Sequence, residues 1–206
     1  MVSQIYLGNP PDNIKAWIQE HSQPASHPET RFTLEGGIVE THNITGTLDQ
    51  QWMIDNGFFN EDDWEWTKTI TQVDIGNTVT SIGNSAFYSC SMTNVTIPDS
   101  VTGIENHAFY ECRLMSVTIP DSVKSIGSFA FFSCSRLMSM TIGNSVMNIR
   151  EAAFVGCSSL TNVTFEGKDK VTVQGMTNYP FGLDYANKSG VTIHCTDGDI
   201  PISHAG

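Results

Sequence analysis

The sequence predicts a solenoid of about four to five stacked coils, in which parallel β-strands alternate with short helical or 3₁₀-like turns, behind a small α+β capping unit. Three observations support this prediction. A 22–23-residue repeat fills the middle of the chain, apolar residues alternate in short triplets within it, and the composition changes near residue 70. We therefore expect an N-terminal cap over residues 1–69, repeats over 70–165 and an atypical C-terminal repeat or cap over 166–206.

The repeat is clearest when the sequence is aligned on a phenylalanine. Four segments then read IGNSAFYSC (82–90), IENHAFYEC (104–112), IGSFAFFSC (126–134) and IREAAFVGC (149–157). Each segment is one coil, and equivalent residues of stacked coils superimpose. The predicted core therefore contains two columns, one of phenylalanines and one of cysteines: Phe87, Phe109, Phe131 and Phe154, with Cys90, Cys112, Cys134 and Cys157.

A strand-like triplet recurs in phase with the repeat. It reads Val73-Asp74-Ile75, Val95-Thr96-Ile97, Val117-Thr118-Ile119, Met140-Thr141-Ile142 and Val163-Thr164-Phe165. Because strand side chains alternate between faces, the first and third residues should point inward and the middle residue outward. The residue before each triplet also points outward. Two outward columns result: Asn94, Ser116, Ser139 and Asn162, beside Thr96, Thr118, Thr141 and Thr164, with Gln72 and Asp74 at their head.

The flanks predict capping structure. A strand at residues 3–7 and a helix at 10–20 are expected first, and strands at 31–34 and 38–44 flank the turn Glu35-Gly36-Gly37, which is typical of a hairpin. Thr47 and Gln50 have capping-box spacing ahead of a short helix that Gly57 would end. At the other end, Val191-Thr192-Ile193 is the next strand-like triplet, and it follows Val163-Thr164-Phe165 at an interval longer than one repeat.

Composition and charge exclude several functions. Ten Lys+Arg against 22 Asp+Glu give a formal net charge of −12, which argues against nucleic acid as a partner. No run approaches the roughly 18 apolar residues of a membrane span, and the first residues lack the basic start and apolar stretch of a secretory signal. Of the charged residues in 1–70, eleven are acidic and three basic, and all four tryptophans fall there.

No motif for catalysis or for a cofactor is present. Cysteines that recur once per repeat do not match the short spacing of zinc ligands, and stacked cysteines have parallel Cβ directions that oppose disulfides, so we interpret the column as core packing. His194 and Cys195 are adjacent and point to opposite strand faces, which prevents a nucleophile–base pair. Glu61-Asp62-Asp63 lacks the pattern of a calcium loop. We expect no enzyme, no metal and no cofactor.

The unit IGxxAFxxCxxLTxVTIPDSV resembles the BspA-type leucine-rich repeat, over roughly residues 70–165, and the segment GVTIHCTDGDI (190–200) is similar to the end of such arrays. A 22–23-residue period also lies within the range of leucine-rich repeats. The resemblance implies adhesion or protein recognition without catalysis, in an extracellular or cell-surface protein.

The outward columns are the predicted ligand-binding face. They are polar and lack lysine and glutamate, and short hydroxyl and amide side chains lose little entropy on binding. The predicted ligand is a protein or a glycan. Three alternatives stay open: threonine is an ordinary solvent-facing strand residue, the repeats act as a spacer while residues 1–69 mediate assembly, or the acidic N-terminal unit is an enzyme. Trp64 and Trp66 are expected to pack between cap and first coil or to stack on a sugar.

Overall fold

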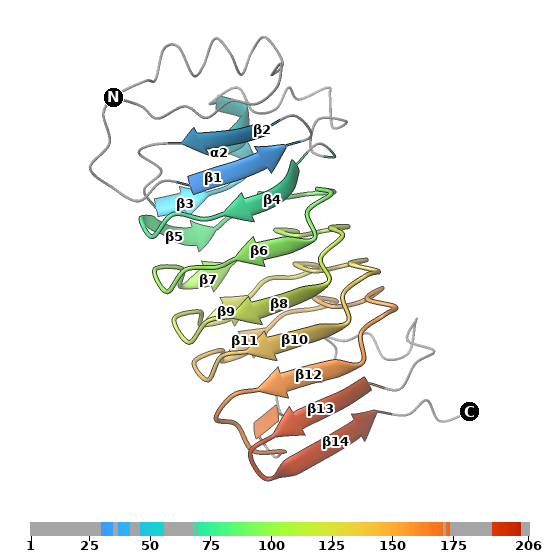
Figure 1. Cartoon of the computed structure of the whole chain (residues 1–206). Helices are drawn as coiled ribbons and strands as arrows, with labels where there is room; N and C mark the ends of the chain where they lie inside the picture. Colours follow the sequence, from blue (N-terminus) through green and yellow to red (C-terminus); the bar gives the residue numbers. More distant parts are fainter. Residues whose placement is uncertain are drawn as a thin grey trace.

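A stack of coils, one coil per repeat, forms the protein in this computed structural model (Figure 1). The structure describes residues 30–34, 37–41, 46–55, 68, 70–170, 172–173 and 191–202. The expected elements at residues 3–7 and 10–20, Gly57, Glu61-Asp62-Asp63, Trp64 and Trp66 lie outside these residues. The predicted solenoid is confirmed, and helix is nearly absent from the described residues: α2 (Gln50–Asp55) precedes the repeats.

Strands of successive coils pair side by side into two walls. The first wall holds the triplets and consists of two sheets, in the order β2 (Gly37–Thr41), β1 (Thr30–Leu34), β4 (Ile70–Asp74), β6 (Asn94–Thr96), and then β8 (Ser116–Ile119), β10 (Ser139–Ile142), β12 (Asn162–Phe165), β13 (Val191–Cys195), β14 (Gly198–Ile202). The second wall is one parallel sheet of β3 (Gly46–Leu48), β5 (Val79–Ile82), β7 (Gly103–Ile104), β9 (Ser125–Ile126) and β11 (Asn148–Ile149).

The AFxxC segments form the third side of each coil. Alternate N–H groups donate to carbonyls of the next coil, while the N–H groups between them donate three residues back and close 3₁₀-type turns. In each coil the third residue of the first turn and the third residue of the last turn have positive φ, which interrupts the turns before they can continue as a helix. Such backbone is strained for residues other than glycine, and the bonds between coils hold it in place. These residues are Ser85, Ser89, His107, Glu111, Phe129, Ser133 and Ala152, with φ from 53° to 59°.

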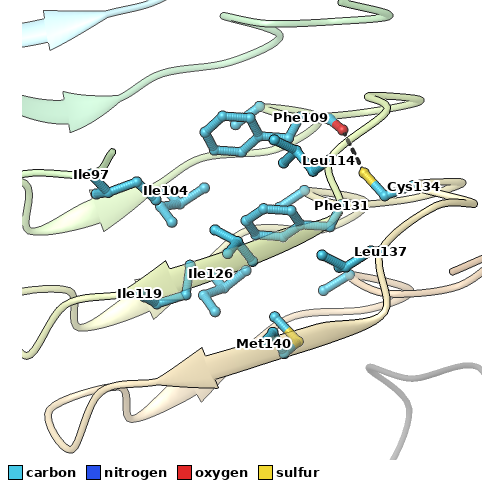
Figure 2. Packing of buried hydrophobic residues seen from close by; sticks show 14 of the residues in the cluster. Ile97, Ile104, Phe109, Leu114, Ile119, Ile126, Phe131, Cys134, Leu137 and Met140 are labelled. Carbon is cyan, nitrogen blue, oxygen red and sulfur yellow. Dashed lines mark hydrogen bonds between the residues drawn. The ribbon is translucent and has the colours of Figure 1, made fainter. Parts of the chain in front are cut away.

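The interior is a continuous apolar column through all coils. The four phenylalanine rings are fully buried and stack in order, with centroids 5.3, 5.0 and 5.5 Å apart. In the middle coils the rings of Phe109 and Phe131 are accompanied by isoleucines of both walls and by a leucine, as Figure 2 shows, while the first coil has Met92 in place of the leucine. A single coil cannot enclose this interior, so stacking is what buries it.

Strands from the predicted N-terminal cap pair directly with strands of the first coil. β1 and β2 form the predicted antiparallel hairpin, and β1 pairs antiparallel with β4. The predicted capping box is wrong, because Thr47 belongs to β3, which pairs parallel with β5. Asp49 caps α2 instead: its Oδ1 accepts a hydrogen bond of 2.8 Å from the Trp52 N–H.

The last coil has a different register from the one that the triplet alignment predicts. Val163 is paired with Ile193 and not with Val191, so the partner strand is displaced along the chain by one inward-facing position. This displacement keeps the same side chains on the same face, because strand periodicity is two. Val191 and Ile193 are accordingly buried. β14 then closes the first wall antiparallel to β13.

Truncating one core ring tests the stacking. Replacing Phe131 by alanine leaves a cavity between Phe109 and Phe154, and we expect the free energy of unfolding to fall by about 3–5 kcal/mol. Urea denaturation followed by circular dichroism measures this change. The exposed Arg136 is a matched control in the same coil, and Arg136→Ala should change stability by less than about 0.5 kcal/mol. Equal effects of the two substitutions would contradict the stacked core.

Close approach of neighbouring coils predicts a second effect. A Cβ added at Gly127 would lie 2.5 Å from the backbone carbon of Glu105, so Gly127→Ala should destabilise the protein by about 1–3 kcal/mol. Gly103 is the control, because its Cβ would meet nothing closer than a side-chain oxygen at 3.4 Å. Thermal unfolding of both variants compares their stabilities. If the Gly103→Ala protein is less stable than the Gly127→Ala protein, the close approach of coils at Gly127 is disproved.

Candidate functional site

The outward columns of the first wall form one polar surface, which we call the outer face. Register aligns its residues across strands: Ser116, Ser139 and Asn162 lie side by side, as do Thr118, Thr141 and Thr164. Gln72 and Asp74 pair with Asn94 and Thr96 in the same way. None of these side chains is buried, and none is basic. The alternation of the triplets accounts for their outward position, while the binding role of this face stays a prediction.

Few of the polar groups on the outer face are bonded to one another. Asn94 and Asn162 each donate to the hydroxyl of the threonine that precedes them, at 3.3 and 3.0 Å. Within the described part of the chain, no protein partner is found for six hydroxyls of this face, and these groups are open to solvent or to a ligand. They belong to Thr96, Ser116, Thr118, Ser139, Thr141 and Thr164.

His194 extends the outer face at its C-terminal end. It is in register with Thr164, and its Nδ1 lies 2.9 Å from Asp199 Oδ1 while its Nε2 lies 3.3 Å from Asn162 Oδ1. Cys195, in contrast, packs against the core. The two residues therefore lie on opposite faces, and the histidine is held by Asp199 and Asn162. Asp199 was not among the sequence candidates, because only the β13–β14 pairing brings it opposite His194.

The outer face is interrupted between β6 and β8. The two strands are neighbours in Figure 1, yet no ladder pairs them, although every residue of both is described. At the end of the later strands, Gly143 N–H donates to the Ile119 carbonyl at 2.9 Å. Pro120 occupies the equivalent position for Ile97, and Pro98 that for Ile75. Neither has an N–H to donate, and β4 and β6 pair nevertheless, so the proline alone does not account for the interruption. A groove of about 410 Å³ lies at the interruption, lined by outer-face residues together with Val95, Asp99 and Pro120.

The cysteine column is part of the core and of the contact between coils. Three of the four thiols donate to the carbonyl of the phenylalanine in the preceding coil: Cys112 to Phe87 at 2.9 Å, Cys134 to Phe109 at 3.1 Å (Figure 2) and Cys157 to Phe131 at 3.2 Å. All five cysteines are free. Burial raises the pKa of Cys112 and Cys134 well above the ordinary value, and that of Cys157 to about 12. Protonated, buried thiols of this kind are poor nucleophiles.

A ladder of aromatic rings on the third side was missed by the sequence reasoning. Tyr88, Tyr110 and Phe132 stack with centroids 4.7 and 5.0 Å apart, and His107 stacks on Phe129 at 5.3 Å. Both faces of the Tyr110 ring are covered by neighbours, so this middle ring presents its edge where a sugar would need a ring face. The sequence does indicate this ladder, because an aromatic residue follows the core phenylalanine in three successive repeats.

An exposed methionine pair was also missed. Met115 and Met138 are each 45% exposed and stand in equivalent positions just before β8 and β10. They line a shallow groove of about 550 Å³ with Arg136, Ser159 and Thr161. The methionine side chain is unbranched and adapts to irregular partners. This groove is therefore an exposed apolar feature, separate from the polar outer face.

The described residues hold no group of three or more histidine, cysteine, aspartate or glutamate side chains that could bind a metal ion. Within the same ranges, no helix has the length and apolar content that a membrane crossing requires.

Comparison with known families places the chain. Residues 58–179, more than half of the chain, match a model described as the BspA type leucine-rich repeat region, in six copies. The chain belongs to this family. The resemblance inferred from the repeats is confirmed, and these repeats form surface or protein-interaction modules that are generally not enzymes. Comparison with curated proteins finds no match.

Several solved structures are similar. A T. pallidum leucine-rich repeat protein is 24% identical over 45% of this chain and 57% of its own, with a TM-score of 0.40. The pneumococcal vaccine antigen PcpA is 24% identical over 52% and 28%, with a TM-score of 0.45. A leucine-rich repeat protein from Eubacterium ventriosum is 21% identical over 69% and 43%, with a TM-score of 0.48. The chain spans less than two thirds of the length of each.

The raised thiol pKa values predict how this BspA-type repeat protein responds to pH. Thiols of the unfolded chain ionise near pH 8.5, whereas buried Cys157 keeps its proton to about pH 12. Above pH 8.5 the unfolded state therefore binds fewer protons, and the free energy of unfolding falls as pH rises. Cys157→Ala should remove about 1 kcal/mol per pH unit from that slope between pH 9 and 10.5.

Urea denaturation across this pH range measures the slope. Between pH 6 and 7.5, where neither state ionises the thiol, Cys157→Ala and the unmodified protein should show the same pH dependence. Identical slopes above pH 9 would show that this thiol titrates normally in the folded protein.

Proposed function

We propose that this protein is a non-enzymatic recognition or adhesion module that binds a protein or glycan ligand on its outer face. The observation that carries the proposal is the set of six hydroxyls, in two register-aligned columns, that have no protein partner within the described residues. Rigid strands hold these groups about 4.8 Å apart across the sheet, so a ligand meets an array that is already ordered.

Chemistry and entropy both favour binding on this face. Serine and threonine have few rotatable bonds, so less conformational entropy is lost on binding than with lysine or glutamate. Each hydroxyl both donates and accepts, which suits the mixed donors and acceptors of a peptide backbone or of a sugar. A recognition surface on strands is also typical of solenoids, whose stacked repeats create extended surfaces.

Ionisable side chains mark the two ends of the face. His194 and Asp199 form a pair at one end, 2.9 Å apart, and Asp74 lies at the other. Between them the face carries hydroxyls and amides. The extracellular or cell-surface location that the family implies is part of this proposal.

Charge insertion tests the face. Thr96→Lys, Thr118→Lys and Thr141→Lys together place three long cations across it, and we expect ligand binding to fall at least ten-fold. A glycan and host-protein array, probed with the intact chain, supplies the ligands. The matched control carries the same three added charges on the second wall: Thr80→Lys, Thr102→Lys and Met147→Lys, all at exposed positions. If every ligand binds both triple variants equally, the outer face is not the site.

A further inference from the structure

We propose that the groove between β6 and β8 binds a lysine or arginine side chain of a protein partner, with the aliphatic part against Val95 and Pro120 and the cationic end at Asp99. The inference deepens the proposed function of the outer face and rests on it. It selects a protein partner over a glycan and assigns one coil boundary as the primary contact.

The floor of the groove is apolar. Val95 is partly exposed, whereas the residues at its position in every other described coil are buried: Val73, Val117, Met140 and Val163. Pro120 and Val117 also line the groove. No ladder pairs the fully described strands β6 and β8 at this boundary, and the side chain of Val95 is accessible there. Lysine and arginine side chains cover such apolar surface with their methylene groups.

The rim of the groove supplies a carboxylate. Asp99 is exposed, and within the described residues no protein group is bonded to it. Its equivalent one coil along, Asp121, is already engaged: its Oδ1 accepts a hydrogen bond of 2.6 Å from the Asn144 N–H. No lysine or arginine lines the groove, so Asp99 has no internal counter-ion there. A cation at the end of an aliphatic stem is complementary both to this carboxylate and to a chain of net charge −12.

A sugar fits the groove less well. None of the residues that line it is aromatic, so no ring face is available for stacking. Neutral sugars also gain nothing from Asp99 beyond what any acceptor offers. Polar groups of Asn94, Ser116, Thr96 and Thr118 surround the groove and can bond the partner's backbone on either side of the basic side chain.

Two short peptides provide the probe. The pentapeptide acetyl-Thr-Val-Lys-Val-Thr-amide and its glutamine counterpart differ in the central side chain alone, and titration of the full chain followed by NMR chemical shifts compares their affinities. We expect the lysine peptide to bind at least ten-fold more tightly. Asp99→Asn should remove this preference, whereas Asp121→Asn, the matched control in the next coil, should keep it.

A second pair of variants tests the apolar floor of the groove. Pro120→Ala removes a ring that lines the groove and should weaken lysine-peptide binding several-fold. Pro98→Ala is the matched control, because Pro98 holds the equivalent position one coil earlier and does not line the groove, and it should leave binding unchanged. Circular dichroism and urea denaturation confirm that all four variants are folded.

The outcomes separate the two proposals. Equal binding of both peptides, or a lysine preference that Asp99→Asn and Pro120→Ala leave intact, overturns the assignment of the groove. If neutral glycans bind and the triple lysine variant of the outer face loses them, the groove inference fails while the proposed function stands. If the triple variant and its second-wall control bind every ligand equally, both fail.

Discussion

The bonds between coils constrain the rest of the structure, because each coil depends on its neighbours along all three sides. Strands pair along two walls, and alternate N–H groups of the AFxxC segments donate to the next coil along the third. These bonds require equivalent residues to superimpose once in every repeat. The phenylalanine stack, the thiol–carbonyl bonds and the glycine at 127, where a Cβ would meet backbone, all follow from that close superposition.

The same superposition produces the surface. Residues that point outward from each strand are aligned across coils like those that point inward, so one repeat position becomes a column of chemically similar side chains. On the first wall this gives threonine beside serine or asparagine. On the third side it gives rings that cover one another's faces. A column of hydroxyls remains open to a ligand, whereas in a column of stacked rings the neighbouring rings already contact one another. This difference favours the outer face as the candidate site.

The outer face differs from coil to coil at the positions where the repeat is irregular. Within the described residues, no ladder pairs β6 with β8, Val95 is accessible between these strands, and Asp99 lacks the bond that its equivalent Asp121 makes. At the end of the array, β14 returns antiparallel and brings Asp199 to His194. A regular solenoid offers a ligand many equal positions, so its irregular boundaries are the places that can select among ligands.

Sequence alone determined the repeat, the inward and outward positions and the hairpin, because each depends on spacing and alternation within one or two coils. Tertiary structure decided what depends on neighbours distant in the chain. Thr47 joined a strand because β5 offered it a partner. The last coil took a register displaced by two residues from the expected one, which strand alternation alone does not decide, because both registers keep Val191 and Ile193 on the inward face. The groove beside Val95 likewise required the strands of two successive coils to meet, and no local pattern shows where a ladder between coils will open.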